Sequence, residues 1–301
     1  MVEPGLQIAD YELLRHVAGG ATSDVYEGRH AASGQPVAVK VLYREHCLDD
    51  AIVTRFLNEA CALQELRHAR ILTIITWGRL LEGRPFMVLE WLPHTLAQAL
   101  ARAGGAVPSR VAASLAAQMA EALAALHDRG AIHRDLKPAN VLLTREDLAT
   151  AEIKLADLGL AKILRETTAA AAPLGVFPIS TGGSDRLGTW EYMAPEQWIR
   201  SKSVDPKADV YALGVLLFQM IAGRLPFVAE HQKEWMGSHL LESPPMHLLA
   251  GRAVRPLRDL VAQMLGKKAA PRPTMGDVAA QLTALQSRQI EARGASRRTG
   301  E

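Results

Sequence analysis

The pattern of apolar residues changes near Pro93, and this change limits the folds available to the chain. Before Pro93, short apolar and β-branched runs alternate with turn signals, at residues 11–17, 25–29, 37–42, 71–78 and 86–89. Residues 51–66 interrupt them with a helical period that puts Phe56, Ala60 and Leu63 on one stripe. The first part of the chain therefore predicts a small β-rich lobe with one main helix.

Helical patterns dominate after Pro93. Residues 109–128 carry apolar side chains at three- and four-residue spacing, between the start signal Pro108 and the stop signal Gly130. Residues 211–221 are apolar on nearly every side, which is typical of a buried helix, and are too few to span a bilayer. We predict an α+β chain with a larger, mainly helical second lobe. The expected divisions of the chain are an N-terminal extension, small lobe, hinge, large lobe and polar tail at 1–10, 11–89, 90–94, 95–286 and 287–301. We expect the polar tail to fray.

Charge and cysteine content narrow the functional classes. The 301 residues have a formal net charge of +2, too small to indicate binding to nucleic acid or to an anionic membrane. Residues 1–10 lack the basic start and apolar core of a secretory signal. Cys47 and Cys61 form no metal or disulfide pattern and fit a reducing compartment, and we expect each to be a small packing residue rather than a nucleophile. We expect a cytoplasmic chain without a membrane span, or the cytoplasmic part of a longer membrane-anchored protein.

Residues 133–140, His-Arg-Asp-Leu-Lys-Pro-Ala-Asn, carry the strongest chemical signal. They place a carboxylate, an ammonium and a carboxamide close together, with Pro138 stiffening the backbone between them. Phosphoryl transfer needs these groups, because a carboxylate orients the attacking hydroxyl, a cation meets phosphate charge and an amide oxygen helps to hold Mg²⁺. A charged surface turn after a helix is the alternative interpretation.

Three weaker signals point to the same chemistry. Residues 18–25 are small and lie between two predicted strands, so backbone amides there can approach phosphate oxygens, although a Gly-Gly hairpin explains them equally well. Lys40 ends an apolar strand and needs a partner, for which Glu59 is the candidate; an exposed lysine is the alternative. Asp157 follows a strand and precedes Leu158-Gly159, which suits a cation ligand or an Asx turn.

Taken in order, these segments resemble the eukaryotic-like (Hanks-type) Ser/Thr protein kinase family. The sequence of residues 20–26, GATSDVY, is most similar to bacterial members. The resemblance covers about residues 11–286 and implies a bilobal fold with a small antiparallel sheet. Its supporting segments are 37–40 (VAVK), 133–140 (HRDLKPAN), 157–159 (DLG), 188–196 (GTWEYMAPE), 209–214 (DVYALG) and 272–274 (RPT).

The resemblance implies a role for each matching residue. Lys40 contacts the α- and β-phosphates of ATP and pairs with Glu59, Asp135 orients the substrate hydroxyl, and Lys137 contacts the γ-phosphate. Asn140 and Asp157 bind Mg²⁺, with Mn²⁺ as an alternative. Asp209 braces the loop backbone, and Glu196 pairs with Arg272. The implied ATP-contacting residues are Ala18, Gly19, Gly20, Ala21, Thr22, Ser23, Val25, Ala38, Lys40, Leu89, Glu90, Leu92 and Leu142.

The chain departs from the family pattern at three places. Ala18 and Ser23 stand where the family has glycine, which puts nucleotide affinity in question, and Leu158 replaces a phenylalanine. The segment after the hinge, 93–95, lacks the usual small or acidic residues.

Regulation is implied by Arg134, which precedes Asp135 and in such kinases contacts a phosphate on the activation segment. We expect autophosphorylation within residues 167–184. The candidate regulatory hydroxyls are those of Thr167, Thr168, Ser180, Thr181, Ser184 and Thr189, the last of which matches a family position that contacts the catalytic residues.

The sequence is compatible with three functions. The first is an active Ser/Thr kinase that acts on protein hydroxyls, its own included. The second is a nucleotide-binding pseudokinase scaffold, which the depleted glycine loop favours. The third is a small-molecule phosphotransferase, against which the peptide-docking segment 188–196 argues. The sequence leaves the oligomeric state open.

Overall fold

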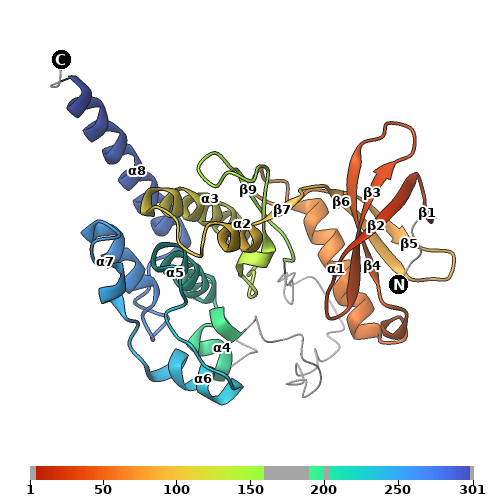
Figure 1. The fold of residues 1–301 in the computed structure, drawn as a ribbon. Coiled ribbons are helices and arrows are strands. Elements are labelled where there is room, and N and C mark those ends of the chain that lie inside the picture. Colours follow the sequence, from red (N-terminus) through yellow and green to blue (C-terminus); the bar gives the residue numbers. More distant parts are fainter. Residues whose placement is uncertain (1–4, 159–189, 200–203, 299–301) are drawn as a thin grey trace. The chain divides into compact units, whose positions relative to one another are not determined.

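The computed structural model describes residues 5–158, 190–199 and 204–298, with side chains described as far as Ser287. The described residues form two compact units that meet in the sequence between Pro93 and His94. Figure 1 shows the strand-rich character of the first unit and the helix-rich character of the second. The α+β class predicted from the sequence is confirmed.

The first unit contains a six-stranded antiparallel sheet in the order β1-β2-β3-β4-β6-β5. The strand bounds are β1 Gln7–Ile8, β2 Tyr11–Gly19, β3 Ser23–His30, β4 Pro36–Leu42, β5 Ile74–Arg79 and β6 Pro85–Glu90. Apolar side chains of these strands form a buried cluster that includes Leu13, Val39 and Val88. The β-rich prediction for this part of the chain is therefore correct.

Helix α1, Asp50–Glu65, is the main helix of the first unit. The Asp49 side chain accepts hydrogen bonds from the Ala51 and Ile52 amides, which satisfies backbone donors at the helix start. The predicted stripe of Phe56, Ala60 and Leu63 is buried. The predicted strand at residues 71–78 begins too early. Strand β5 starts at Ile74, because Ile71 and Leu72 are buried but lie outside the strand.

The second unit combines helices with a small three-stranded sheet. Its strands are β7 His94–Thr95, β8 Val141–Leu143 and β9 Ile153–Leu155, paired antiparallel in that order. The α-helices are α2 Leu96–Arg102, α3 Ser109–His127, α4 Pro195–Ile199, α5 Lys207–Ala222, α6 Gln232–Leu241, α7 Arg255–Met264 and α8 Met275–Arg298. Short 3₁₀ turns include η2 Pro138–Asn140, which precedes β8, and η4 Trp190–Tyr192.

Helix α5 is buried along nearly its whole length, as the uninterrupted apolar run predicts. It packs against α3 and α7, and it ends at Gly223, whose φ of 79° suits glycine. None of the helices among the described residues combines the length and the apolarity that a bilayer crossing requires.

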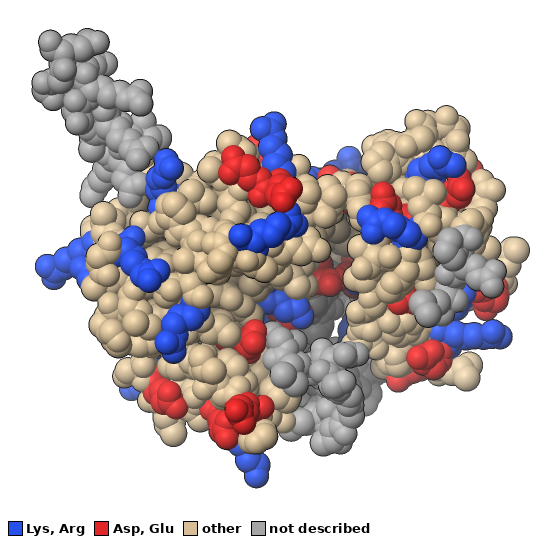
Figure 2. All heavy atoms as spheres, viewed as in Figure 1, with Lys and Arg blue, Asp and Glu red and all other residues tan. Residues whose placement is uncertain are grey.

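Two expectations need correction. Residues 287–298 continue α8 as helix, whereas the sequence suggests a fraying polar tail; this stretch has no proline and is rich in helix-favouring Ala, Gln, Glu and Arg. Cys61 is exposed rather than a packing residue, and neither it nor Cys47 forms a disulfide. Positive and negative side chains are interspersed on the face drawn in Figure 2, as expected from the small net charge.

Candidate functional site

The loop at residues 133–140 brings three polar side chains together in the second unit. Lys137 Nζ donates to Asp135 Oδ2 at 2.9 Å. Asn140 Nδ2 donates to the backbone oxygen of Asp135 at 2.8 Å and to its Oδ2 at 3.1 Å. The Asp135 and Lys137 side chains remain 32% and 24% exposed, so both can still meet another molecule. The carboxylate, ammonium and amide that the sequence motif predicts are thus one cluster.

Asp209 on α5 fixes the backbone of this loop. Its Oδ2 accepts the His133 amide at 2.9 Å, and its Oδ1 accepts the Arg134 amide at 2.8 Å. His127 Nε2 lies 2.8 Å from Oδ2. Burial alone raises the pKa of Asp209, but the hydrogen bond and charge of His127, the charge of His133 and the Arg134 amide outweigh it and hold that pKa below its usual value.

Arg134 occupies a strained and partly buried position. Its φ is 64°, a conformation that costs energy for a residue with a Cβ and persists because Asp209 holds the amides of Arg134 and His133. Its Nε atom is buried and has no hydrogen-bond partner among the described residues. Burial lowers the pKa of Arg134, and the charge of Asp209 opposes part of that effect. A further anion near this guanidinium would therefore be stabilised.

Asn140 and Asp157 approach each other through the β8–β9 pairing. Val141 is the register partner of Leu155, and the Ala156 amide donates to the Asn140 carbonyl oxygen at 2.9 Å. Asp157, the next residue, has a φ of 49°, which turns the chain directly after this contact. Carboxylate and amide oxygens are donors that suit Mg²⁺. Since no cluster of three His, Cys, Asp or Glu occurs in the described parts, such an ion would draw further ligands from water and phosphate.

In the first unit, Lys40 and Glu59 form the predicted pair. Lys40 Nζ donates to the two carboxylate oxygens at 3.0 and 3.2 Å, joining β4 to α1. The side chains are only 13% and 15% exposed, so water and salt screen the attraction between the two charges less than in a surface ion pair.

The predicted ATP-contacting residues of the first unit gather on its central strands. In the register, Ala38 lies opposite Leu89 and Val25 opposite Lys40. Residues 20–22 connect β2 and β3, and residues 18–21 are exposed. The Gly20 amide donates to the Ser23 carbonyl at 2.8 Å. The Glu90 carboxylate accepts the Thr73 amide at 2.7 Å, which gives this side chain a structural partner.

Other predicted residues lie elsewhere. Leu92 is partly buried at the end of the first unit, whereas Leu142 belongs to β8 of the second. Glu196 and Arg272 form a bidentate ion pair, at 2.7 and 2.9 Å, around a guanidinium with no exposed surface. The candidate regulatory residues, Thr167, Thr168, Ser180, Thr181, Ser184 and Thr189, fall outside the described residues.

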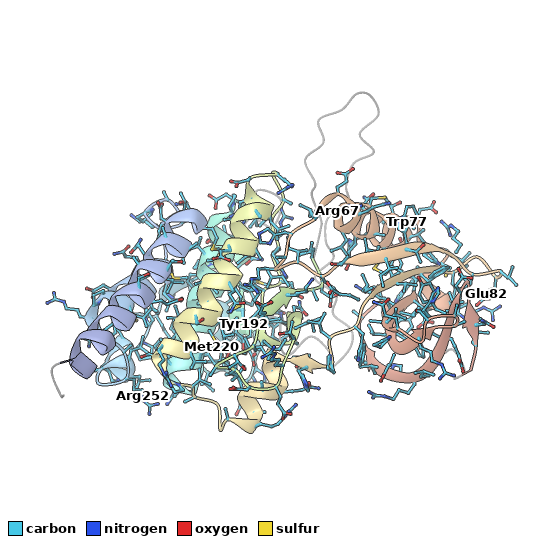
Figure 3. All side chains as sticks on the ribbon, turned by 90° about the horizontal axis from the view of Figure 1, so that it is seen from above. Arg67, Trp77, Glu82, Tyr192, Met220 and Arg252 are labelled. Carbon is cyan, nitrogen blue, oxygen red and sulfur yellow. The ribbon has the colours of Figure 1, made fainter. Side chains whose placement is uncertain are left out.

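The sequence reasoning missed several supporting groups. His127 could not be recognised, because nothing in the sequence relates it to Asp209, 82 residues away. Gln197 Nε2 donates to the Arg134 carbonyl at 3.1 Å, and Tyr192, labelled in Figure 3, donates to Gln219 Oε1 at 2.7 Å. Asp24 is a buried acid on β3, and an acid next to the apolar run at residues 25–29 is the sequence signal that points to it.

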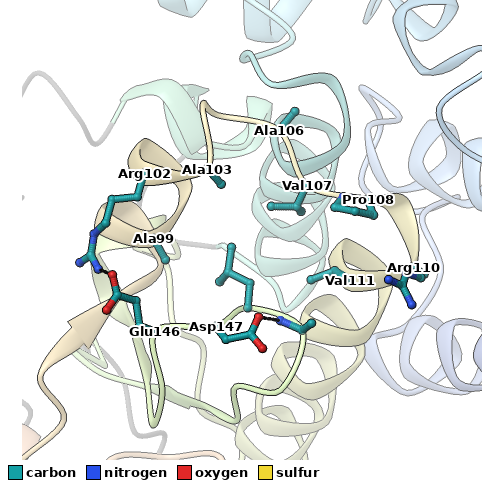
Figure 4. Close-up of a pocket in the computed structure, with 12 residues that line it drawn as sticks. Ala99, Arg102, Ala103, Ala106, Val107, Pro108, Arg110, Val111, Glu146 and Asp147 are labelled. Carbon is teal, nitrogen blue, oxygen red and sulfur yellow. Dashed lines mark hydrogen bonds and ion pairs between the residues drawn. The ribbon is translucent and has the colours of Figure 1, made fainter.

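A cavity of about 390 Å³ opens elsewhere on the second unit, between α2, the start of α3 and the loop at residues 144–150 (Figure 4). Small apolar residues line much of it, and Arg102 and Glu146 form an ion pair at its edge. None of the site residues predicted from the sequence lines this cavity.

Comparisons with known proteins agree on one family. The model of the protein kinase domain matches residues 11–283. Serine/threonine-protein kinase Pkn1 of Myxococcus xanthus is 34% identical over 94% of this chain and 38% of its own length. Serine/threonine-protein kinase pkn2 of the same organism is 32% identical over 91% of this chain and 32% of its own length. Serine/threonine-protein kinase PknL of Mycobacterium tuberculosis is 33% identical over 76% of this chain and 53% of its own length. The chain thus spans about a third to a half of these relatives.

Proposed function

The chain belongs to the protein kinase family, and we propose that it transfers the γ-phosphoryl group of Mg-ATP to serine or threonine hydroxyls of proteins. The observation that carries this proposal is the cluster of Asp135, Lys137 and Asn140, held by hydrogen bonds of 2.8 to 3.1 Å. A surface turn does not require side chains to converge on one carboxylate. Phosphoryl transfer does, because its catalysis rests on positioning and charge.

Each residue of the cluster has a distinct task in this proposal. Asp135 accepts a hydrogen bond from the substrate hydroxyl and takes its proton as the hydroxyl oxygen bonds to the γ-phosphorus. The bond between that phosphorus and the β–γ bridging oxygen breaks at the same time, and ADP leaves. Lys137 stabilises charge on the transferred group. Asn140 and Asp157 hold the divalent ion, which we take to be Mg²⁺, with Mn²⁺ as the alternative; when bound, the ion neutralises phosphate charge. The fixed Asp209 hydrogen bonds support this assignment, since they leave the loop little freedom.

Lys40 contributes from the first unit. Glu59 holds its ammonium through two hydrogen bonds, which orients the group toward the α- and β-phosphates in the proposed complex. The predicted ATP contacts at Val25, Ala38, Leu89 and Glu90 remain part of the proposal.

Arg134 links the proposed activity to regulation. Its buried Nε has no hydrogen-bond partner in the described segments, and a phosphate provides oxygen acceptors and negative charge. We infer that autophosphorylation within residues 167–184 supplies that phosphate. Phosphopeptide mapping of the active protein should find modified Ser or Thr in this interval; an unmodified interval in fully active protein would refute the regulatory proposal.

Intact-mass analysis tests the function directly. Wild type and Asp135→Asn are each incubated with Mg-ATP and a generic Ser/Thr protein substrate. The proposal expects added phosphate masses only with the wild type. Phosphorylation of neither the chain nor any protein substrate by the wild type would argue against it, and equal phosphorylation by both proteins would argue against the role of Asp135.

The pseudokinase alternative is favoured by one observation, the replacement of two loop glycines by Ala18 and Ser23. It predicts that Mg-ATP raises the melting temperature without any phosphate transfer. A small-molecule phosphotransferase would instead phosphorylate small hydroxyl compounds and leave proteins unmodified. We place the proposed kinase in the cytoplasm, where ATP is available; whole-cell fractionation of the natural protein tests this.

A further inference from the structure

Asp24 is the centre of a polar network inside the β2–β3 hairpin. Its Oδ1 lies 2.8 Å from His16 Nε2 and accepts the Tyr43 hydroxyl at 3.2 Å. Its Oδ2 accepts the Tyr26 hydroxyl at 3.2 Å. The Asp24 side chain is only 8% exposed. A carboxylate at this depth is costly unless donors surround it, and three donors do so here.

The network joins segments that are separate in the sequence. His16 lies on β2, Asp24 and Tyr26 lie on β3, and Tyr43 follows β4 directly. Two backbone contacts strengthen the link between the hairpin tip and the segment after β4. The Tyr43 amide donates to the Thr22 carbonyl at 2.8 Å, and His46 Nε2 lies 3.3 Å from the Ala21 carbonyl. The segment after β4 therefore holds the hairpin tip through the carbonyl groups of Ala21 and Thr22 and through the Asp24 carboxylate.

Gly19 shows how tightly the hairpin fits this network. It is the register partner of Asp24, and a Cβ added to Gly19 would lie 3.0 Å from the Tyr43 hydroxyl and 3.3 Å from Asp24 Oδ1. A Cβ at Gly20 would meet only the Ser23 carbonyl, at 3.4 Å. Space at position 19 is thus needed by the Tyr43–Asp24 hydrogen bond.

The chemistry of the donors keeps the network intact near neutral pH. Partial burial raises the pKa of Tyr43, and the negative charge of Asp24 and the hydrogen bond to it raise it further. Tyr43 therefore stays protonated and remains a donor. A carboxylate has no proton to give, so His16 Nε2 must carry the hydrogen of its contact with Asp24.

We propose that Asp24 is a positioning residue for nucleotide binding, which fixes the shape of hairpin residues 19–23 through His16, Tyr26 and Tyr43. The family pattern relies on glycines at positions 18 and 23, and this chain has Ala18 and a buried Ser23 there. In our proposal, the hydrogen bonds of Asp24 hold the hairpin in the shape that the glycines make accessible in the family pattern. This inference rests on the proposed function, because it assumes that the hairpin contacts ATP phosphates.

The test compares nucleotide binding and turnover in Asp24→Asn and Tyr43→Phe with the wild-type chain. Glu12→Gln is the control for Asp24→Asn, and Tyr11→Phe is the control for Tyr43→Phe. Each control removes a carboxylate or a tyrosine hydroxyl from β2 at a residue outside the network. Affinity for Mg-ATP is measured by isothermal titration, and KM for ATP, KM for the protein substrate and kcat by steady-state assays. Melting temperatures are recorded for all five proteins.

We expect Asp24→Asn to weaken ATP binding and raise KM for ATP roughly tenfold, equivalent to about 1.4 kcal/mol. Tyr43→Phe should act in the same direction with a smaller effect. Because the chemical groups are untouched, kcat at saturating ATP and KM for the protein should change by less than about twofold, and the controls should match wild type.

Two results would overturn the inference. One is unchanged ATP affinity in both network variants. The other is a fall in melting temperature and kcat with no change in KM for ATP, which would make the network purely structural. If Asp24→Asn does not fold, Tyr43→Phe alone decides between these outcomes. A wild-type chain that binds no ATP would contradict the proposed function itself.

Discussion

Asp209 illustrates how one buried carboxylate determines the conformation of a distant loop. It accepts the amides of His133 and Arg134 from 76 and 75 residues away, and His127 closes the arrangement. The positive φ of Arg134 is the consequence, since two successive amides must point at the same carboxylate. The resemblance implied the role of Asp209, but His127 emerges only from three-dimensional packing.

His239 on α6 is a second buried titratable residue, outside the proposed site. Its ring stacks between Trp198 and Trp235, at centroid distances of 6.5 and 5.9 Å, and its Nδ1 lies 2.9 Å from the Tyr211 hydroxyl. Burial lowers the pKa of His239 to about 4, and the charge of Lys267 contributes. The folded state therefore binds this proton less readily than the unfolded state.

The sign of the pH dependence follows. Below the ordinary histidine pKa of 6.5, the unfolded chain gains a proton that the folded chain excludes, so stability falls as the pH drops toward 4. We expect a loss of about 2 kcal/mol between pH 7 and pH 5 from this residue. Urea unfolding at both pH values measures it. His239→Phe should lose less stability over that interval, whereas the exposed His247→Asn should behave as wild type. Equal pH dependence in all three proteins would refute the assignment.

The spacing of apolar residues was sufficient to predict the longer strands and helices. The strands from Tyr11 to Leu42 and the helices α1, α3 and α5 lie where the sequence predicts them. Short or late elements were not predictable. Strand β8 has three residues, too few to establish a period, and it exists because β7 and β9 pair with it. Buried apolar residues outside a ladder, such as Ile71, also imitate a strand.

Helix α5 offers a sharp test of the packing. A Cβ at Gly214 would lie 2.9 Å from the Cβ of Met264 on α7, closer than two carbon atoms approach unless one of the helices shifts. Gly214→Ala should therefore lower the free energy of unfolding by about 1–3 kcal/mol, despite the better helix propensity of alanine.

The matched control is Gly237→Ala in α6, where an added Cβ would meet nothing within 4 Å. There the propensity gain should stabilise the protein by up to about 1 kcal/mol. Denaturant unfolding of the two variants measures both effects, and a stabilised Gly214→Ala would contradict the packing described for α5.

For the whole molecule, the proposed chemistry is divided between the two units. Lys40 and Glu59 belong to the first, whereas Asp135, Asn140 and Asp157 belong to the second. The Lys40–Glu59 pair could be anticipated from charge, because a buried lysine needs a carboxylate, and the spacing within residues 133–140 places Asp135 close to Asn140. The approach of Asn140 to Asp157 could not, because it depends on the β8–β9 pairing. The proposal that both sets serve one nucleotide rests on the family resemblance, since no local pattern in the sequence connects Lys40 with Asp135.

Lys40→Met tests the contribution of the first unit. It removes the ammonium and leaves Glu59 without this partner, so we expect kcat/KM to fall about 10²–10³-fold, the range for loss of one preorganised charge contact. Circular dichroism should show an unchanged fold. Lys233→Met, an exposed substitution on α6, is the control and should retain full activity. Retention of wild-type kcat/KM by Lys40→Met would exclude Lys40 from the phosphate contacts.

The most direct test of the central claim is the turnover of Asp135→Asn on a Ser/Thr peptide at saturating Mg-ATP. Asparagine keeps the shape and the contact with Lys137 but cannot take a proton. We expect kcat to fall about 10²–10⁴-fold and ATP affinity to stay unchanged. The control Asp147→Asn, in an exposed loop, should be as active as wild type. A wild-type rate in Asp135→Asn would contradict the account.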